Sequence, residues 1–204
     1  MHVRGRKASV PMIFGLLTIW TACTAGDLPT VKIKAGEKMA DFTLADASGK
    51  PHSLYELKGK KAVAVIFIAT KCPYSNAFNQ VMAKLAREYA DKGVAVVGIN
   101  PNKTEPAAEV AQHANTHGLG FPVLKDENNA LADRLGASVT PEVFLLDGDF
   151  MLRYHGALGN SAKPTTKAEE ASDAEIRPAL DALLAGQSVA QVQTKAFGCT
   201  IKRI

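Results

Sequence analysis

The apolar run over residues 62–69 constrains the fold of this chain more than any other segment. Every residue in it is hydrophobic, with no alternation of polar side chains. A strand of this kind is covered on both faces, as in the parallel sheets of α/β proteins. We therefore predict a central buried strand over 61–69. A second apolar run predicts a neighbouring buried strand over 94–99.

The other segments alternate between strand and helix patterns. Shorter strands are predicted at 41–44, 121–124, 143–146 and 151–154, and helices at 73–90, 106–117, 128–135 and 172–184. Turn residues at 46–50 and 147–149 predict two hairpins, and Ser172 with Glu175 has the pattern of a capping box for the last helix. Strands that alternate with helices predict an α/β fold, and the hairpins make its sheet mixed.

A chain of 204 residues is long enough to bury one substantial core. We predict a single domain over residues 39–186. A polar linker over 27–38 precedes this domain, and a tail over 187–204 follows it and carries Cys199.

The first 26 residues have the pattern of an export signal. Three basic side chains precede an apolar run over 10–20, and small residues follow over 21–26. Ala22-Cys23 fits a lipoprotein cleavage site, which would make a lipidated Cys23 a membrane tether. Cleavage after residue 25 or 26 is the alternative. Both routes predict an exported protein, either periplasmic or anchored to the membrane and facing the periplasm.

Charge and metal-ligating residues restrict the possible partners. Removal of the first 26 residues leaves 21 basic and 20 acidic side chains, so a nucleic-acid partner is not expected. His113 and His117 are four residues apart on one predicted helix face, a spacing that can hold a metal ion. Since no third ligand is evident, we predict a solvated helix face there, with no metal site and no cofactor.

Cys72 has the sequence surroundings of a redox-active thiol. It lies between the predicted strand over 61–69 and the helix that follows, where backbone N–H groups and the helix dipole stabilise a thiolate. Pro73 fits the first helical turn because its missing N–H is not needed there, and Lys71 adds a neighbouring cation. Cys72 is therefore the predicted nucleophile. Ser75 could hydrogen-bond its thiolate, but capping the helix is the favoured interpretation.

Several segments of the chain together carry a family pattern. They lie at 40–50, 72–73, 93–100, 121–126, 140–147 and 182–202. In combination they resemble the thioredoxin superfamily, and more narrowly its exported, peroxiredoxin-related group, the redoxins of the AhpC/TSA type. The resemblance implies a thioredoxin-like fold, in which helices flank a mixed central sheet that an N-terminal hairpin extends.

The same resemblance implies a set of substrate-binding residues beside Cys72. Pro141 would be a cis proline that packs next to the thiolate, which leaves the backbone of Thr140 free to pair with a substrate chain. Pro73 and Ser75, which follow Cys72, complete the expected substrate-binding set.

Departures from the family pattern bear on the activity. Ser75 stands where thioredoxins have the second cysteine of Cys-x-x-Cys, so a resolving thiol has to come from elsewhere. Ala69 replaces the threonine or serine of peroxiredoxins, whose active-site arginine is also missing ahead of Thr140. Ile66 replaces the buried carboxylate of many thioredoxins. The peroxidase reading is weakened by these changes.

The two cysteines of the domain leave three hypotheses open. The leading one is an exported thiol–disulfide oxidoreductase that acts on protein or small-molecule disulfides and thiols. Cys72 attacks, and either Cys199 or an external thiol reductant resolves the mixed disulfide. Alternatively, Cys72 and Cys199 form a structural disulfide in a non-catalytic binding protein, a bond worth about 4–5 kcal/mol in the loop-entropy model. The third hypothesis is a thiol peroxidase that forms a sulfenic acid at Cys72.

Overall fold

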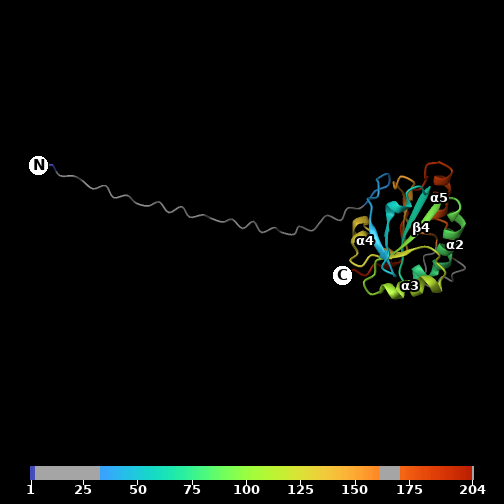
Figure 1. Cartoon of the computed structure of the whole chain (residues 1–204). Helices are drawn as coiled ribbons and strands as arrows, with labels where there is room; N and C mark the ends of the chain where they lie inside the picture. Colours follow the sequence, from blue (N-terminus) through green and yellow to red (C-terminus); the bar gives the residue numbers. More distant parts are fainter. Residues whose placement is uncertain (3–32, 161–170, 204) are drawn as a thin grey trace.

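The computed structural model describes residues 1–2, 33–160 and 171–203 (Figure 1). The expected export signal from residue 3 onward, including Cys23, lies outside the described residues, as do residues 27–32 of the expected linker. No helix within the described ranges has the length and apolar content needed to cross a membrane.

Seven strands form the central sheet. Their order is β2 (Pro51–Ser53), β1 (Thr43–Asp46), β5 (Val123–Lys125), β4 (Val94–Asn100), β3 (Ala62–Phe67), β7 (Glu142–Asp147) and β8 (Leu152–Gly156). β3, β4 and β5 run parallel, whereas β1, β7 and β8 pair antiparallel with their neighbours. The sheet is therefore mixed, and the N-terminal hairpin β1–β2 extends one edge of it, as predicted.

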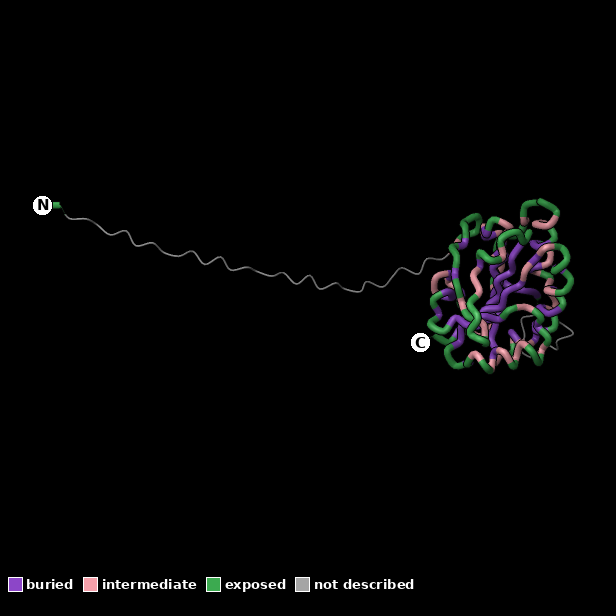
Figure 2. The backbone as a smooth tube through the Cα atoms, in the orientation of Figure 1, coloured by how far each residue is buried: buried purple, intermediate pink, exposed green. Residues whose placement is uncertain are grey.

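Helices cover both faces of this sheet. They are η1 (Leu54–Leu57), α1 (Pro73–Ala77), α2 (Asn79–Ala90), α3 (Ala107–Thr116), α4 (Ala130–Leu135) and α5 (Ile176–Leu184). The apolar residues of α2, α3 and α5 join one core layer, and those of η1 and α4 join the layer on the other face. Every residue of β3 is fully buried between them, which confirms the central position predicted for this strand (Figure 2).

Two helix predictions differ from the structure. The single helix predicted over 73–90 is interrupted at Phe78, which packs into the core and separates α1 from α2. The capping box is wrong, because α5 begins at Ile176 and the Ser172 hydroxyl donates to Asn160 instead. A helix from residue 172 would place Pro178 in its interior, whereas the observed start keeps this proline in the first turn, where it is tolerated.

Both ends of the domain are attached to β8. Among the described linker residues, the Gly36 amide donates to the Leu152 carbonyl, so this part of the expected linker packs on the domain. The tail runs beside β8, where the Thr194 amide donates to the His155 carbonyl. It then crosses to β6 (Val139–Thr140) and pairs with it antiparallel through β9 (Cys199–Thr200). The end of the chain therefore returns to the segment just before Pro141.

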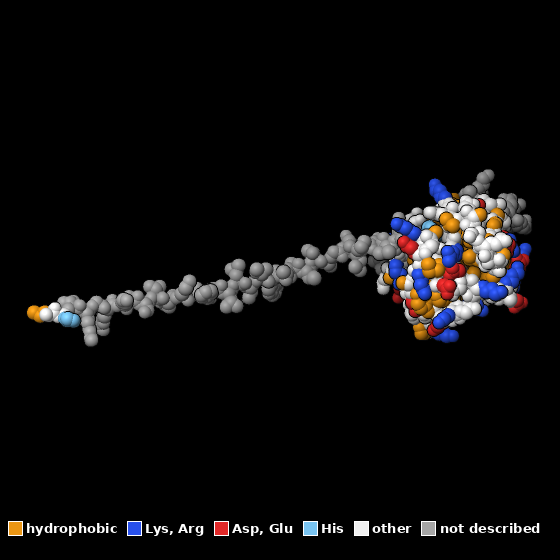
Figure 3. All heavy atoms as spheres, turned by 90° about the horizontal axis from the view of Figure 1, so that it is seen from above, with side chains coloured by type: hydrophobic (Ala, Val, Ile, Leu, Met, Phe, Trp, Pro, Cys, Tyr) orange, Lys and Arg blue, Asp and Glu red, His pale blue; other side chains and the backbone are white. Residues whose placement is uncertain are grey.

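The surface carries charges of both signs. In the view of Figure 3, Lys and Arg side chains are interspersed with Asp and Glu side chains over the domain. This mixed face agrees with the near-neutral charge expected for residues 27–204.

Candidate active site

Cys72 is the N-cap residue of α1, at the point where the chain leaves β3. Only 2% of its surface is exposed. Its Sγ accepts a hydrogen bond from the Ser75 amide at 3.4 Å, and its thiol donates to the Thr140 carbonyl at 3.1 Å. Pro73 occupies the first helical position. The predicted placement of Cys72 between a buried strand and a helix N-terminus is thus confirmed.

Ser75 does not cap the helix as the sequence suggests. The sulfur of Cys72 caps α1, so the prediction of a Ser75 side-chain cap is wrong. Ser75 is fully buried, and its hydroxyl accepts a hydrogen bond from the Ala69 amide at 3.1 Å. The hydroxyl therefore ties the first turn of α1 to the end of the β3 segment, and only its backbone N–H reaches the sulfur.

The Lys71 ammonium is not directed at Cys72. It forms an ion pair with Glu109 of α3 at 2.9 Å and donates to the Thr104 carbonyl at 3.0 Å. The expected cation beside the thiolate is therefore already engaged by a carboxylate. The hydrogen bond from Ser75 remains as the contact that stabilises charge on this sulfur.

Thr140 and Pro141 lie directly against Cys72, and the peptide bond between them is cis, as the resemblance implies. The backbone of Thr140 is not free, however, because it pairs with Cys199. A substrate chain could take this edge only after the tail leaves it. The buried Thr140 hydroxyl has no hydrogen-bond partner within the described part of the chain.

Cys199 lies beside Cys72, and both are free thiols in this structure. Its backbone pairs with that of Thr140, whose carbonyl accepts the hydrogen bond from the Cys72 thiol, and β9 contacts α1. Burial and the neighbouring Cys72 raise the pKa of Cys199 to about 11. At neutral pH, Cys199 is therefore a protonated thiol.

The tail holds Cys199 in place from both sides. Phe197 packs edge-on against Tyr74, with ring centroids 6.1 Å apart, and also contacts Phe78. On the other side, Ile201 is buried in the core and its amide donates to the Ser138 carbonyl. Phe197 and Ile201, the two apolar residues that flank Cys199 in the sequence, thus dock the tail on the domain.

The histidines of α3 are not a purely solvated face. His113 is half-buried and hydrogen-bonds Asn79 of α2, and its ring lies 4.4 Å from that of His117. Within residues 1–2, 33–160 and 171–203, no group of three or more His, Cys, Asp or Glu side chains is arranged to hold a metal ion.

Sequence reasoning missed two buried carboxylates near the cysteines. Glu105 accepts hydrogen bonds from the amides of Thr70 and Lys71, directly before Cys72. Glu142 follows Pro141 and hydrogen-bonds His155 at 2.6 Å. A glutamate beside Pro141 was visible in the sequence, whereas nothing local marks Glu105 as buried.

Comparisons with known proteins agree with this geometry. Residues 35–155 match the family model described as the AhpC/TSA family. The chain belongs to the AhpC/TSA family. This family membership confirms the redoxin group that the sequence motifs indicate, and the architecture around Cys72 and the cis proline is thioredoxin-like.

Two curated relatives have names that refer to thiol chemistry or to thioredoxin. "Thioredoxin-like protein YneN" of Bacillus subtilis is 37% identical over 64% of this chain and 75% of its own length. "Thiol-disulfide oxidoreductase ResA" of Halalkalibacterium halodurans is 33% identical over 56% of this chain. The chain spans 63% of the length of that ResA protein.

A solved structure matches nearly the whole described domain. It is the structure of a hypothetical protein from Sinorhizobium meliloti 1021. The two sequences are 37% identical, and the two structures superpose with a TM-score of 0.78. The match covers 85% of this chain and 96% of the other. The match to almost the whole of that chain shows that the two proteins share this fold.

Proposed function

We propose that this protein is an exported thiol–disulfide oxidoreductase in which Cys72 is the nucleophile and Cys199 the resolving thiol. One observation carries the proposal. Cys199, distant in the sequence, lies next to Cys72 at the start of α1, because Thr140 pairs with Cys199 and also accepts the hydrogen bond from the Cys72 thiol. The names of the ResA relatives and the AhpC/TSA family membership support the same chemistry.

The proposed reaction has two exchange steps. The Cys72 thiolate attacks one sulfur of a partner disulfide, forms a mixed disulfide and releases the other partner sulfur as a thiolate. Cys199 then attacks the Cys72 sulfur and forms the Cys72–Cys199 disulfide. Because Cys199 is a protonated thiol, its proton passes to the departing partner thiolate. An external thiol reductant returns both cysteines to thiols.

Access to Cys72 depends on the tail. With Cys72 almost fully buried and β9 paired to Thr140, a protein substrate has to displace β9, whereas a small disulfide needs a smaller opening. We infer that Pro73, Thr140 and Pro141 contact the substrate, with the unpartnered Thr140 hydroxyl as a hydrogen-bond donor to it. Ser75 is buried and acts through its amide on Cys72.

The compartment follows from the sequence pattern and not from the described residues. An export signal over residues 1–26 would deliver the domain to an oxidising compartment, where disulfide exchange is useful. A lipidated Cys23 would then tether it to the membrane. Labelling with a radioactive fatty acid distinguishes the two routes, because only the lipoprotein route incorporates label at Cys23.

One observation favours the structural-disulfide alternative. The tail is anchored at Phe197 and at the buried Ile201, so the two sulfurs stay together without help from a substrate. A Cys72–Cys199 bond in such a setting could be permanent. The two functions therefore differ in how easily that bond is reduced.

A redox titration tests the proposed function. The protein is equilibrated with dithiothreitol buffers, and mass mapping follows Cys72 and Cys199. A catalytic pair should have a potential above about −300 mV, whereas a structural bond lies below it. Cys199→Ser should accumulate a mixed disulfide at Cys72 with hydroxyethyl disulfide, and Cys72→Ser should not react. Failure of Cys72 to form this adduct would exclude the oxidoreductase.

A further inference from the structure

Glu105 is a buried carboxylate that the proposed reaction does not use. Only 1% of its surface is exposed. Its Oε2 accepts hydrogen bonds from the Thr70 amide at 2.8 Å and the Asn100 side chain at 2.6 Å. Its Oε1 accepts from the Lys71 amide at 3.1 Å and the Asn102 side chain at 3.0 Å. An ionised carboxylate has about four acceptor sites, so donors fill this one completely.

The charge on Glu105 is stabilised inside the protein. Burial alone would raise the pKa of Glu105, but the surrounding donors outweigh this effect and hold the pKa below its ordinary value. The buried Lys125 ammonium donates to Asn100 Oδ1 at 2.9 Å and to the Asn102 carbonyl at 2.5 Å. The Asn100 side chain therefore lies between the two charges: it accepts a hydrogen bond from the Lys125 ammonium and donates one to the Glu105 carboxylate.

This cluster contacts the segments that carry both cysteines. Thr70 and Lys71 directly precede Cys72, so Glu105 fixes the backbone from which the nucleophile projects. Asn102 uses its other side-chain atom, Oδ1, to accept from the Lys202 amide at 2.8 Å. Lys202 lies just beyond β9 and Cys199.

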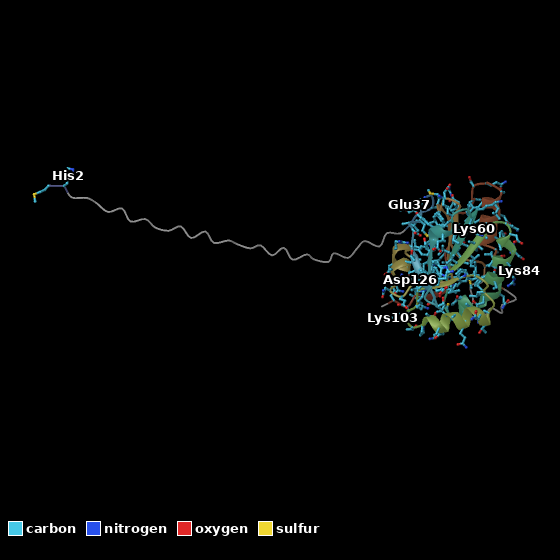
Figure 4. All side chains as sticks on the ribbon, viewed as in Figure 1. His2, Glu37, Lys60, Lys84, Lys103 and Asp126 are labelled. Carbon is cyan, nitrogen blue, oxygen red and sulfur yellow. The ribbon has the colours of Figure 1, made fainter. Side chains whose placement is uncertain are left out.

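A second bond reinforces the attachment of the tail. The amide of Lys103, a residue labelled in Figure 4, donates to the Lys202 carbonyl at 3.3 Å. Both polar groups of the Lys202 backbone are therefore held by the loop after β4. The same loop carries Glu105, so it connects the chain before Cys72 with the chain after Cys199.

We propose that Glu105 is a positioning residue for the redox pair, holding the chain before Cys72 directly and the tail that carries Cys199 through Asn102. The inference rests on the proposed function, because it assigns Glu105 a part in Cys72–Cys199 exchange. By fixing both segments to one carboxylate, Glu105 raises the effective concentration of each thiol at the other.

The substitution Glu105→Gln removes this arrangement without changing the size of the side chain. All four neighbours of the carboxylate are donors, so the new amide N–H₂ must face two donors in either orientation. The donors of Thr70 and Lys71 are backbone N–H groups, so they cannot reorient. The Asn102 side-chain amide could flip to offer its oxygen to the glutamine, but its N–H₂ would then face the Lys202 amide, which would lose its hydrogen-bond acceptor.

Glu109, in the first turn of α3, provides a matched control. It contacts the same two residues, Thr70 and Lys71, but through their side chains and not their backbone amides. Glu109→Gln therefore removes the same charge at the surface and leaves the backbone before Cys72 in place.

The test is the equilibrium between the Cys72–Cys199 disulfide and glutathione, measured with wild type, Glu105→Gln and Glu109→Gln. We expect Glu105→Gln to lower the equilibrium constant for disulfide formation by about tenfold or more, with Glu109→Gln unchanged. Thermal unfolding is measured in parallel. A lower melting temperature with an equilibrium constant equal to that of wild type would show a merely structural role and overturn the proposal.

A second variant keeps the proposal testable if Glu105→Gln does not fold. Asn102→Ala removes the acceptor of the Lys202 amide and one of the four donors to Glu105, but it leaves the Thr70 and Lys71 amides bonded to the carboxylate. It should also lower the equilibrium constant, whereas an unchanged constant would overturn the proposal. Failure of the proposed function is distinct from both results. In that case wild type itself would form no reversible Cys72–Cys199 disulfide with glutathione.

Discussion

Thr140 and Cys199 are backbone partners in a two-stranded antiparallel pair, β6–β9. Thr140 also accepts the hydrogen bond from the Cys72 thiol, so this one residue contacts both cysteines. The edge that a substrate chain is expected to use is therefore occupied by this protein's own tail. This arrangement places the predicted resolving thiol at the nucleophile before any substrate arrives.

Gly198 allows the tail to approach this closely, and its replacement should release the tail. A Cβ atom there would lie 1.9 Å from the Thr140 carbonyl oxygen, at a φ of +154° that other residues rarely adopt. Gly198→Ala should lower the free energy of unfolding by about 1–3 kcal/mol and slow Cys72–Cys199 disulfide formation. Urea unfolding and quenched-flow alkylation measure the two effects.

The control for this change is Gly186→Ala. Gly186 also has a positive φ, of +68°, but an added Cβ would have no atom within 4 Å. This variant should show backbone strain alone, with normal disulfide formation. Equal rates of disulfide formation in the two variants would contradict the importance of the close approach at Gly198.

Cys199 should make the protein less stable as the pH rises from about 9 to about 11. The folded protein holds the Cys199 proton more tightly than the unfolded chain, because burial and Cys72 raise its pKa from 9.0 to about 11. This contribution is complete below pH 9 and is lost as the pH rises through 11. The measurement is the pH dependence of the free energy of unfolding, compared with that of Cys199→Ala. Parallel curves for the two proteins would contradict the prediction.

Glu142 should stabilise the loop before β6 only while it is ionised. It accepts hydrogen bonds from the Ser138 and Val139 amides and from His155. Burial alone would raise the pKa of Glu142, but these donors outweigh burial and lower it below the ordinary 4.5. The stabilisation is therefore present above pH 4.5 and is lost as the pH falls through the lower folded pKa.

Glu142→Gln tests this dependence. It should lower the free energy of unfolding at pH 7 by about 1–3 kcal/mol, because a neutral amide loses the charge-assisted hydrogen bonds that the carboxylate accepts from the Ser138 and Val139 amides and from His155. The difference from wild type should shrink when unfolding is repeated below pH 4.5. Glu37→Gln, at an exposed site, is the control. A difference that is the same at both pH values would rule out the ionised carboxylate as its source.

Hydrogen peroxide should be a poor oxidant of Cys72. Ala69 supplies no side-chain hydroxyl, and its amide is already bonded to Ser75. Stopped-flow oxidation of Cys199→Ser isolates the first step. We expect a rate constant close to that of an ordinary thiolate at the same pH. A much larger constant would restore the thiol peroxidase hypothesis.

The sequence by itself determined the features that depend on neighbouring residues. The apolar run over 62–69 predicted a buried central strand, and Cys72-Pro73 predicted the start of a helix at its end. Both features depend on burial and on proline geometry, which act between residues close in the sequence, so they could be predicted without knowledge of the tertiary contacts. The turn residues of the hairpins predicted the mixed sheet, and the family resemblance implied the cis Pro141.

Only the tertiary structure decided which groups meet at the cysteines. Local spacing suggested Lys71 as the charge next to Cys72 and Ser75 as the helix cap. In the structure, Lys71 forms an ion pair with Glu109, and the Ser75 hydroxyl accepts a hydrogen bond from the Ala69 amide. Cys199 reaches Cys72 because β9 pairs with β6. Such contacts join residues far apart in the chain, and they form because each buried polar group requires a partner that the folded chain brings to it.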